Sequence, residues 1–270
     1  MCYGWTRAKK NKEEVMDDMN PRTVLITGAS SGFGEACARR FAAAGSKVIL
    51  VARRADRLEK LKSELAAPVY VLKMDIRKRS LVEEAIRSLP TEFSEIELLV
   101  NNAGLALGFD RAYQGSLDDW DVMIDTNVKG LVYCTRFLLE GMVSRNRGHV
   151  INIGSVAGSF PYVGGNVYGA TKAFVKQFSL NLKADLLGTR VRVTNVEPGL
   201  AETEFSLVRF KGDEKRAGAV YKGTEPIRAE DMAEIIFWVA NVPDHLNINR
   251  IEVMPVCQGF DAFKIDRKSS

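Results

Sequence analysis

The segment TVLITGASSGFGEACARR, residues 23–40, sets the architecture expected of the whole chain. Its apolar run Thr23–Thr27 is typical of a strand that is covered on both faces. Gly28 permits a tight turn after this strand, while Gly32 and Gly34 let the backbone and the next helix approach an anion closely. Because the N–H groups that open a helix donate hydrogen bonds to anions, the segment predicts a phosphate-binding turn. The alternative is an ordinary loop.

Beyond this segment, patterns of strand and helix alternate to the end of the chain. Strands are expected at residues 23–27, 47–52, 69–74, 96–101, 149–153, 190–196 and 250–254. Helices are expected at residues 34–44, 56–66 (with Asp56 as a cap), 81–89, 118–144 (one long helix or two joined), 167–187 and 230–240. This spacing predicts an α/β fold, a single Rossmann-type, doubly wound parallel sheet with helices on both faces.

The composition is that of a water-soluble globular protein. Of the 270 residues 46% are hydrophobic and 27% charged, and the net charge of +4 is too small to predict nucleic-acid binding. No apolar run approaches the roughly 18 residues of a membrane span. Four widely spaced cysteines predict reduced thiols, a cytoplasmic location and no metal site.

Two segments interrupt the regular alternation. Residues 1–20 are polar and lack the apolar stretch of a secretory signal, so we expect a flexible N-terminal extension or a short appended helix, with Met19 as a possible natural start. Residues 21–270 are then expected to form a single domain. The charged, irregular residues 200–226 are a lid-like segment near the carboxyl ends of the strands.

The end of the second strand indicates which nucleotide the turn binds. The spacing G-x-x-x-G-x-G differs from the G-x-G-x-x-G of many dinucleotide folds, so the turn alone is weak evidence. Arg53 and Arg54 stand about 20 residues further on, where an acidic residue would hold the ribose of NAD. Two guanidinium groups suit a 2′-phosphate instead, and the alternative is solvated charge. Asp75, after the third strand, either accepts from the adenine amino group or caps the next turn.

Three polar residues indicate redox chemistry on a carbonyl or an alcohol. Ser155 precedes Tyr168 by thirteen positions, and Lys172 follows Tyr168 by four, on the same helix face. A nearby ammonium is expected to lower the pKa of the phenol by two or three units, which needs roughly 3–4 kcal/mol. Tyr168 can then remove an alcohol proton while hydride leaves, with Ser155 holding the substrate oxygen. Alone, a Y-x-x-x-K pattern more often means a packed ring and a surface lysine.

Six motifs together resemble the short-chain dehydrogenase/reductase family from Thr23 to the C-terminal region. They are TGASSGFG at 27–34, NNAG at 101–104, Asn127, Ser155, YGATK at 168–172 and Pro198-Gly199. The resemblance implies a catalytic tetrad of Asn127, Ser155, Tyr168 and Lys172, with Asn127 holding a water and Lys172 bonding the nicotinamide ribose. It also implies a homotetramer, with residues 118–144 and 167–187 at an interface. The residues expected to contact NADP are Gly28, Ser30, Ser31, Gly32, Phe33, Gly34, Arg53, Arg54, Asp75, Ile76, Asn102, Tyr168, Lys172, Pro198, Gly199 and Thr203.

Longer segments are similar to one group within this family. Residues 101–108, 164–182, 197–200 and 203–214 resemble the NADP-dependent 3-hydroxy acid dehydrogenases, which include serine 3-dehydrogenases and L-allo-threonine dehydrogenases. The resemblance implies a short 3-hydroxy acid such as L-serine, L-allo-threonine or 3-hydroxypropionate. Burying its carboxylate without a partner is costly, and Arg209 is the candidate clamp beside Ser155 and Tyr168, with Lys211 or backbone donors as alternatives.

Two other functions are compatible with the same motifs. One is an NADPH-dependent reductase of sulfonated aldehydes, ketones or 3-oxoacyl thioesters. The other is a non-catalytic NADP sensor, which should have lost Tyr168 or Lys172, whereas both are present.

Overall fold

The computed structural model describes residues 22–260 and residue 265, so the expectations for the extension at residues 1–20 lie outside the described residues. One seven-stranded sheet runs through the molecule in the order β3-β2-β1-β4-β5-β6-β7, and all neighbouring strands are parallel. The strands are β1 (Thr23–Thr27), β2 (Lys47–Ala52), β3 (Val69–Lys73), β4 (Leu98–Asn101), β5 (Gly148–Ile153), β6 (Val191–Pro198) and β7 (Arg250–Val253).

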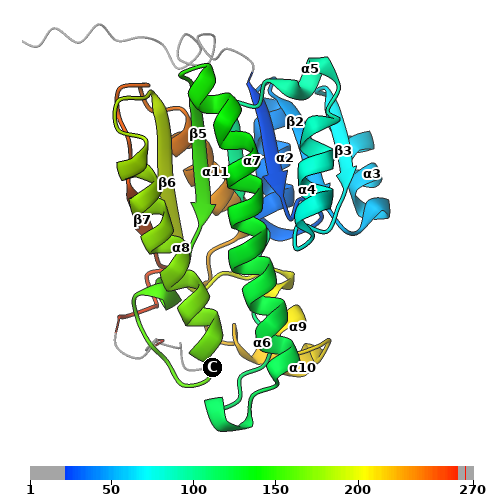
Figure 1. Ribbon diagram of the computed structural model, residues 1–270. Helices are drawn as coiled ribbons and strands as arrows, with labels where there is room; N and C mark the ends of the chain where they lie inside the picture. Colours follow the sequence, from blue (N-terminus) through cyan, green and yellow to red (C-terminus); the bar gives the residue numbers. More distant parts are fainter. Residues whose placement is uncertain (1–21, 261–264, 266–270) are drawn as a thin grey trace, which may run out of the picture.

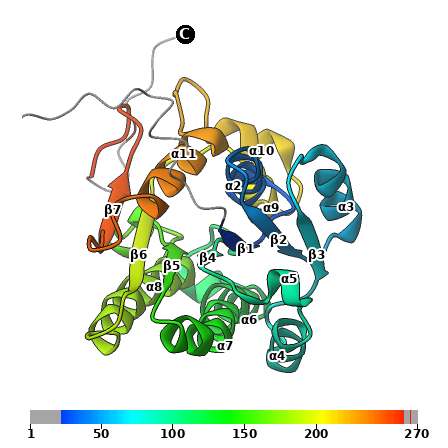
Figure 2. The same ribbon diagram turned by 90° about the horizontal axis from the view of Figure 1, so that it is seen from above.

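Helices cover both faces of this sheet, as Figure 2 shows from above. One face carries α2 (Gly32–Ala43), α3 (Ala55–Glu64) and α11 (Ala229–Ala240). The other carries α4 (Arg79–Arg87), α7 (Leu131–Ser144) and α8 (Asn166–Asp185), and the short α5 (Thr91–Ser94) lies beside α4. The expected Rossmann-type, doubly wound α/β fold is therefore confirmed.

Alternate residues of the central strands supply two separate cores. Val24 and Ile26 of β1 pack with α2 and α11, whereas Leu25 faces the layer of α7 and α8. All three are at most 1% exposed, because side chains of successive strand residues point to opposite faces and both faces are covered. This explains why the interiors of β1 and β2 are continuously apolar rather than alternating.

The expected elements are present, but several boundaries were wrong. Helix α3 begins at Ala55 with Arg54 as its N-cap residue, so Asp56 lies in the first turn and is not the cap. The expected helix 118–144 is α6 (Leu117–Ile124) joined to α7 by a π-helical segment, Asp125–Gly130. Strand β4 begins two residues later than expected, because Ile96 is buried within the preceding turn.

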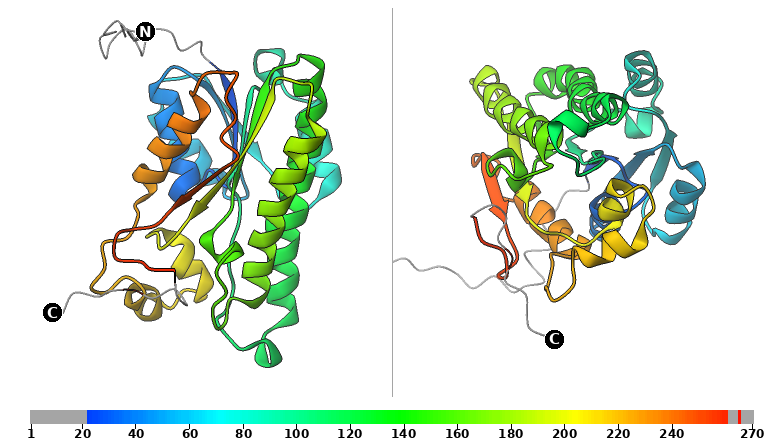
Figure 3. Two further views of the ribbon diagram at one scale, coloured as in Figure 1. Left: turned by 90° about the vertical axis from the view of Figure 1, so that its left-hand side faces the viewer. Right: turned by 90° about the horizontal axis from the view of Figure 1, so that it is seen from below.

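The carboxyl ends of the strands all point to one end of the molecule (Figure 1). The lid-like segment 200–226 lies at this end and contains α9 (Glu204–Arg209) and α10 (Glu214–Ala219). Figure 3 shows these two helices beyond the edge of the sheet, between its two helical layers. The topology therefore collects the glycine turn, the lid-like segment and the start of α8 around one opening. None of the helices in residues 22–260 has the length and apolarity to cross a membrane.

Candidate active site

The glycine turn between β1 and α2 has the backbone that the sequence predicts. Gly28 and Gly32 have φ values of +68° and +55°, a conformation that L side chains rarely adopt. A Cβ on Gly28 would lie 2.9 Å from the Cα of Ala103 and from Nδ2 of Asn102. Glycine at position 28 therefore lets the turn pack directly against the end of β4, where a larger residue would clash.

A cavity of about 530 Å³ extends from this turn to Ser155 and Tyr168. Every residue expected at the cofactor lines it except Gly34, which packs behind the turn against the carbonyl of Gly28. A volume of this size is typical of a small-molecule site. The positive-φ turn at one end, arginines beside it and polar groups at the other end fit a phosphorylated dinucleotide lying along the cavity.

Asn102 is fixed beside the turn by the backbone of β1. Its Nδ2 donates 2.9 Å to the carbonyl of Thr27, and its N–H donates 3.0 Å to the hydroxyl of Thr27. The same hydroxyl accepts the N–H of Ala103 at 3.0 Å. Thr27 thus joins the ends of β1 and β4 beside the glycine turn.

Ser155, Tyr168 and Lys172 come together at the other end of the cavity. Ser155 follows β5, and its Oγ accepts the N–H of Ala157 at 3.1 Å and contacts the phenol of Tyr168. Lys172 lies one turn after Tyr168 on α8, with Nζ 5.8 Å from the centroid of the tyrosine ring. All three side chains are at most 9% exposed, so the convergence expected from the spacing is present.

The protonation of this group differs from the expectation. Burial raises the pKa of Tyr168 above its ordinary value, and the hydrogen bond to Ser155 and the charge of Arg209 only partly oppose this. Burial also lowers the pKa of Lys172 to about 8. The ammonium donates 2.7 Å to the carbonyl of Ile153 and does not offset the desolvation of the phenol. The expected lowering was therefore wrong for the protein alone, in which Tyr168 is held as the neutral acid.

Asn127 lies in the π-helical segment Asp125–Gly130 and is buried beside the site. Its Oδ1 accepts the N–H of Leu105 at 2.9 Å, and its Nδ2 donates to the carbonyl of Leu105 at 2.8 Å and to Oγ1 of Thr171 at 3.0 Å. A Cβ on Gly104 would meet both Asn127 Oδ1 and Lys172 Nζ within 3.4 Å. Asn127 therefore ties the strand β4 loop to α8 beside Lys172, and its water-holding role stays a prediction.

The two arginines after β2 differ from each other. Arg53 is exposed and makes no hydrogen bond or ion pair with any residue in the part of the chain described. Arg54 is half-buried, and its Nη2 donates to the hydroxyls of Ser30 at 2.9 Å and Ser31 at 2.8 Å. Its Nη1 pairs with Glu204 at 2.9 Å. Arg54 therefore also supports the glycine turn, which its position in the sequence does not reveal.

Asp75 already has a partner in the structure. Arg77 donates to its two carboxylate oxygens at 3.0 and 2.6 Å, and these hydrogen bonds hold the pKa of Asp75 below its ordinary range. The backbone N–H of Arg77 also donates to Oδ1 at 3.1 Å, so the turn-capping alternative is present. Ile76 packs against Gly130 of the π-helical segment and lines the cavity.

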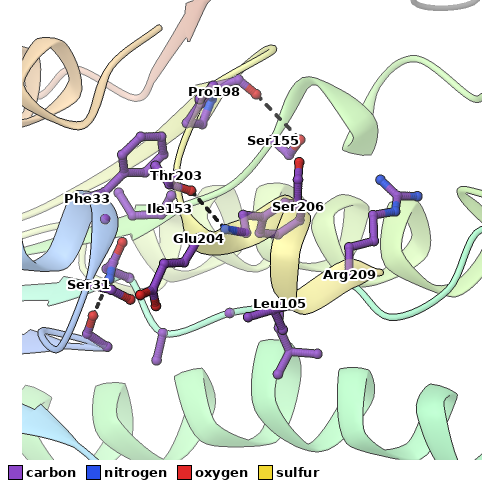
Figure 4. A pocket seen from close by; sticks show the side chains of 18 of the residues that line it. Ser31, Phe33, Leu105, Ile153, Ser155, Pro198, Thr203, Glu204, Ser206 and Arg209 are labelled. Carbon is purple, nitrogen blue, oxygen red and sulfur yellow. Dashed lines mark hydrogen bonds between the residues drawn. The ribbon is translucent and has the colours of Figure 1, made fainter. Parts of the chain in front are cut away.

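The segment after β6 covers the cavity from the other side. The carbonyl of Pro198 accepts a 3.5 Å hydrogen bond from Oγ of Ser155, and Gly199 follows against the side chain of Gln258. Thr203 is the N-cap of α9, where its Oγ1 accepts the N–H of Phe205 at 3.1 Å (Figure 4). Its methyl group lies 3.4 Å from the Cβ position of Gly32.

Arg209 projects from α9 in a different direction from Glu204 of the same helix (Figure 4) and lines the cavity. Its Nε donates 3.1 Å to the carbonyl of Gly108, and its Nη2 donates 3.0 Å to the hydroxyl of Tyr162. The guanidinium carbon lies 5.9 Å from the centroid of the Tyr168 ring and 4.5 Å from that of Phe109. Nη2 also donates 3.5 Å to the carbonyl of Gly164, whereas no described residue accepts a hydrogen bond from Nη1, which can still bind a carboxylate oxygen. Lys211, the alternative clamp, pairs instead with Asp119 at 2.8 Å.

Several residues of the site were missed from the sequence. Tyr162 lies between the motif serine and the motif tyrosine without a recognisable spacing, and Glu204 follows Thr203 as an ordinary first-turn acid. Arg57, Phe109 and Gln258 likewise carry no local signal. Each reaches the site through contacts between segments distant in sequence.

Comparison with known proteins places these features in a family. The family model for short chain dehydrogenases matches residues 22–213. The NADP-dependent 3-hydroxy acid dehydrogenase YdfG of Salmonella typhi is 58% identical over 245 residues, 90% of this chain and 99% of that protein. The serine 3-dehydrogenase of Agrobacterium fabrum is 51% identical over 247 residues, 92% of this chain and 99% of that protein. A solved closed form of serine dehydrogenase complexed with NADP+ is 56% identical, covers 91% of this chain and 99% of its own, and has a TM-score of 0.88.

Proposed function

Since the chain belongs to the short-chain dehydrogenase family, we propose that it is an NADP-dependent oxidoreductase that interconverts a short 3-hydroxy acid with its 3-oxo acid or semialdehyde. The observation that carries the substrate class is the position of Arg209. Its guanidinium carbon lies 5.9 Å from the centroid of the Tyr168 ring, and its Nη1 makes no hydrogen bond to the described residues, whereas Nη2 donates to Tyr162 and Gly164. A carboxylate held there leaves the hydroxyl-bearing carbon of a short acid near the phenol.

The catalytic residues that we propose are Asn127, Ser155, Tyr168 and Lys172. When bound, NADP supplies the acceptor or donor of hydride at its nicotinamide ring. Tyr168 exchanges the proton of the substrate oxygen through its phenol, and the neutral phenol favoured by burial is the form that protonates a carbonyl during reduction. Ser155 donates to the substrate oxygen and stabilises its developing charge.

The remaining parts of the proposal concern cofactor binding and organisation. The glycine turn, Asn102, Ile76 and the segment from Pro198 to Thr203 hold the dinucleotide, with Arg53 and Arg54 at the 2′-phosphate. Residues 21–270 act as one catalytic domain with segment 200–226 as the lid. We further propose a cytoplasmic homotetramer whose contacts use α7 and α8, without nucleic-acid or membrane partners.

Steady-state assays test this function. L-serine, L-allo-threonine and 3-hydroxypropionate should each be tested with NADP and with NAD, and at least one should be oxidised with clear preference for NADP. Reduction of malonic semialdehyde with NADPH is the matching assay in the other direction. If none of the three acids reduces NADP, the substrate class is wrong, and faster turnover of ketones or 3-oxoacyl thioesters would identify the alternative.

A further inference from the structure

The carboxylate of Glu204 bridges two guanidinium groups at the cofactor end of the cavity. Its Oε2 accepts from Nη1 of Arg54 at 2.9 Å, and its Oε1 accepts from Nη1 of Arg57 at 2.5 Å. Glu204 opens α9, whereas both arginines lie at the start of α3. The bridge therefore fastens the lid-like segment to the end of β2, where the 2′-phosphate is expected.

A second contact fastens the same part of the lid to the glycine turn. Thr203, the residue before Glu204, packs with its Cβ 3.3 Å from the Cβ position of Gly32. Arg54 in turn holds the hydroxyls of Ser30 and Ser31. Figure 4 shows the Glu204 side chain directed from α9 toward Ser31, while Arg209 of the same helix points elsewhere. The start of α9 and the phosphate turn thus form one connected unit.

The charges in this unit oppose the binding of another anion. Burial works to raise the pKa of Glu204, but the hydrogen bonds from Arg57 and Arg54 outweigh it and lower the pKa, so the side chain is a carboxylate at neutral pH. A phosphate monoester carries a charge near −2 at this pH. The Glu204 carboxylate and a bound phosphate would both accept hydrogen bonds from the Arg54 guanidinium. Two negative charges on one guanidinium repel each other.

We propose that Glu204 is an internal competitor of the cofactor 2′-phosphate for Arg54. The phosphate, guided by the exposed Arg53, takes Nη1 of Arg54 and leaves Glu204 paired with Arg57 alone. NAD has no 2′-phosphate and leaves the bridge intact. Glu204 is thus a specificity-determining residue that restrains the preference for NADP and links the phosphate to the position of α9. This inference rests on the proposed binding of NADP at Arg54.

Cofactor binding without substrate tests the inference. The dissociation constants of NADP and NAD are measured by calorimetry or fluorescence titration for the wild type, Glu204→Gln and the control Glu202→Gln. We expect Glu204→Gln to bind NADP about two- to fivefold more tightly, with NAD unchanged and the gain shrinking as salt rises. Glu202 carries the same charge two positions earlier and has no ion pair among the described residues, so Glu202→Gln should leave the ratio of the two constants unchanged.

Trypsin cleavage in the lid gives a second readout, because segment 200–226 contains Lys211, Lys215, Arg216 and Lys222. Without cofactor, Glu204→Gln should be cut faster there than the wild type. Unchanged or weaker NADP binding, an equal gain for NADP and NAD, or an unchanged rate of cleavage overturns the competition. A wild type that binds NADP no more tightly than NAD contradicts the proposed function itself, and the inference with it.

Discussion

The ammonium of Lys172 donates a hydrogen bond of 2.7 Å to the carbonyl oxygen of Ile153, at the carboxyl end of β5. The lysine is 6% exposed and has no carboxylate partner among the described residues. Burial without a counter-charge lowers its pKa from the usual 10.5 to about 8. The protein therefore keeps a buried positive charge beside Tyr168 at the expense of folding stability.

Replacing Lys172 by methionine should stabilise the protein at pH 7. The native pKa of about 8 lies below the unfolded value, so the destabilisation is complete below about pH 8 and declines as the pH rises from about 8 to 10.5. The lowered pKa corresponds to a cost of roughly 3 kcal/mol for burying the ammonium. The methionine variant avoids this cost but loses a hydrogen bond that contributes about 1 kcal/mol. Urea unfolding should thus show a gain of about 2 kcal/mol at pH 7 that narrows by pH 10.

Lys176→Met is the matched control for this measurement. Lys176 lies one turn further along α8, is half-buried and donates to Ser159 at 2.9 Å. The free energy of unfolding of Lys176→Met should not rise by a comparable amount at pH 7. A Lys172→Met protein whose free energy of unfolding at pH 7 equals or falls below that of the wild type would show that burial does not penalise the ammonium.

Tyr168→Phe should abolish turnover while NADP still binds. In the proposed mechanism the phenol exchanges the substrate proton, and loss of a general acid or base lowers the rate by about 100- to 10,000-fold. The kcat with the best hydroxy acid and the dissociation constant of NADP are measured on the same preparation. Tyr162→Phe removes a second hydroxyl from the cavity and should retain most of kcat. Similar losses in both variants would remove Tyr168 from the chemistry.

Substitution of Arg53 and Arg54 by alanine should weaken NADP more than NAD, but the two positions should differ. Arg53 has no protein partner in the described residues, so Arg53→Ala should weaken NADP roughly ten- to 100-fold and spare NAD. Arg54→Ala also removes the hydrogen bonds to Ser30 and Ser31, so it should weaken both cofactors. Titration of each variant with both cofactors measures this. Equal losses of NADP and NAD in Arg53→Ala would mean that Arg53 does not recognise the phosphate.

Arg209→Lys should raise KM for the hydroxy acid and leave the binding of NADP unchanged. Lysine keeps the charge but lacks the planar group that donates to Gly108, Tyr162 and Gly164 while presenting Nη1 to a carboxylate. We expect KM for the acid to rise about tenfold or more. In this variant, a neutral alcohol of the same length should have a KM similar to that of the acid, whereas the wild type should bind the acid better. An unchanged KM would place the carboxylate elsewhere. Lys211→Met is the control, because Lys211 pairs with Asp119 outside the cavity.

The strands and the polar motifs could be predicted because their signals are local. Unbroken apolar runs gave the bounds of β1 and β2 to the residue, since both faces of those strands are buried. The pairing of Tyr168 with Lys172 needed only the helical period. Helix ends were less predictable, because the N-cap position of α3 holds Arg54 instead of a typical capping residue.

Contacts between distant segments could not be predicted. Glu204 meets Arg54 only because the lid folds back over the end of β2, and no periodic pattern links the two positions. The pKa of Tyr168 followed from burial, which the sequence does not quantify, and the predicted effect of Lys172 was overestimated for that reason. The assignments of individual residues to catalysis and cofactor binding stay predictions.

The π-helical segment Asp125–Gly130 gives α6 and α7 different tasks. Met123 of α6 packs with Tyr168 at the site, whereas Cys134 and Leu138 of α7 pack in the layer against the sheet. A π-helical turn closes over more residues than an α-helical one, so residues before and after the segment do not continue along one helix face. Substitutions on the inner face of α6 should therefore act first on the packing around Tyr168, whereas those at Cys134 or Leu138 should act on the packing against the sheet.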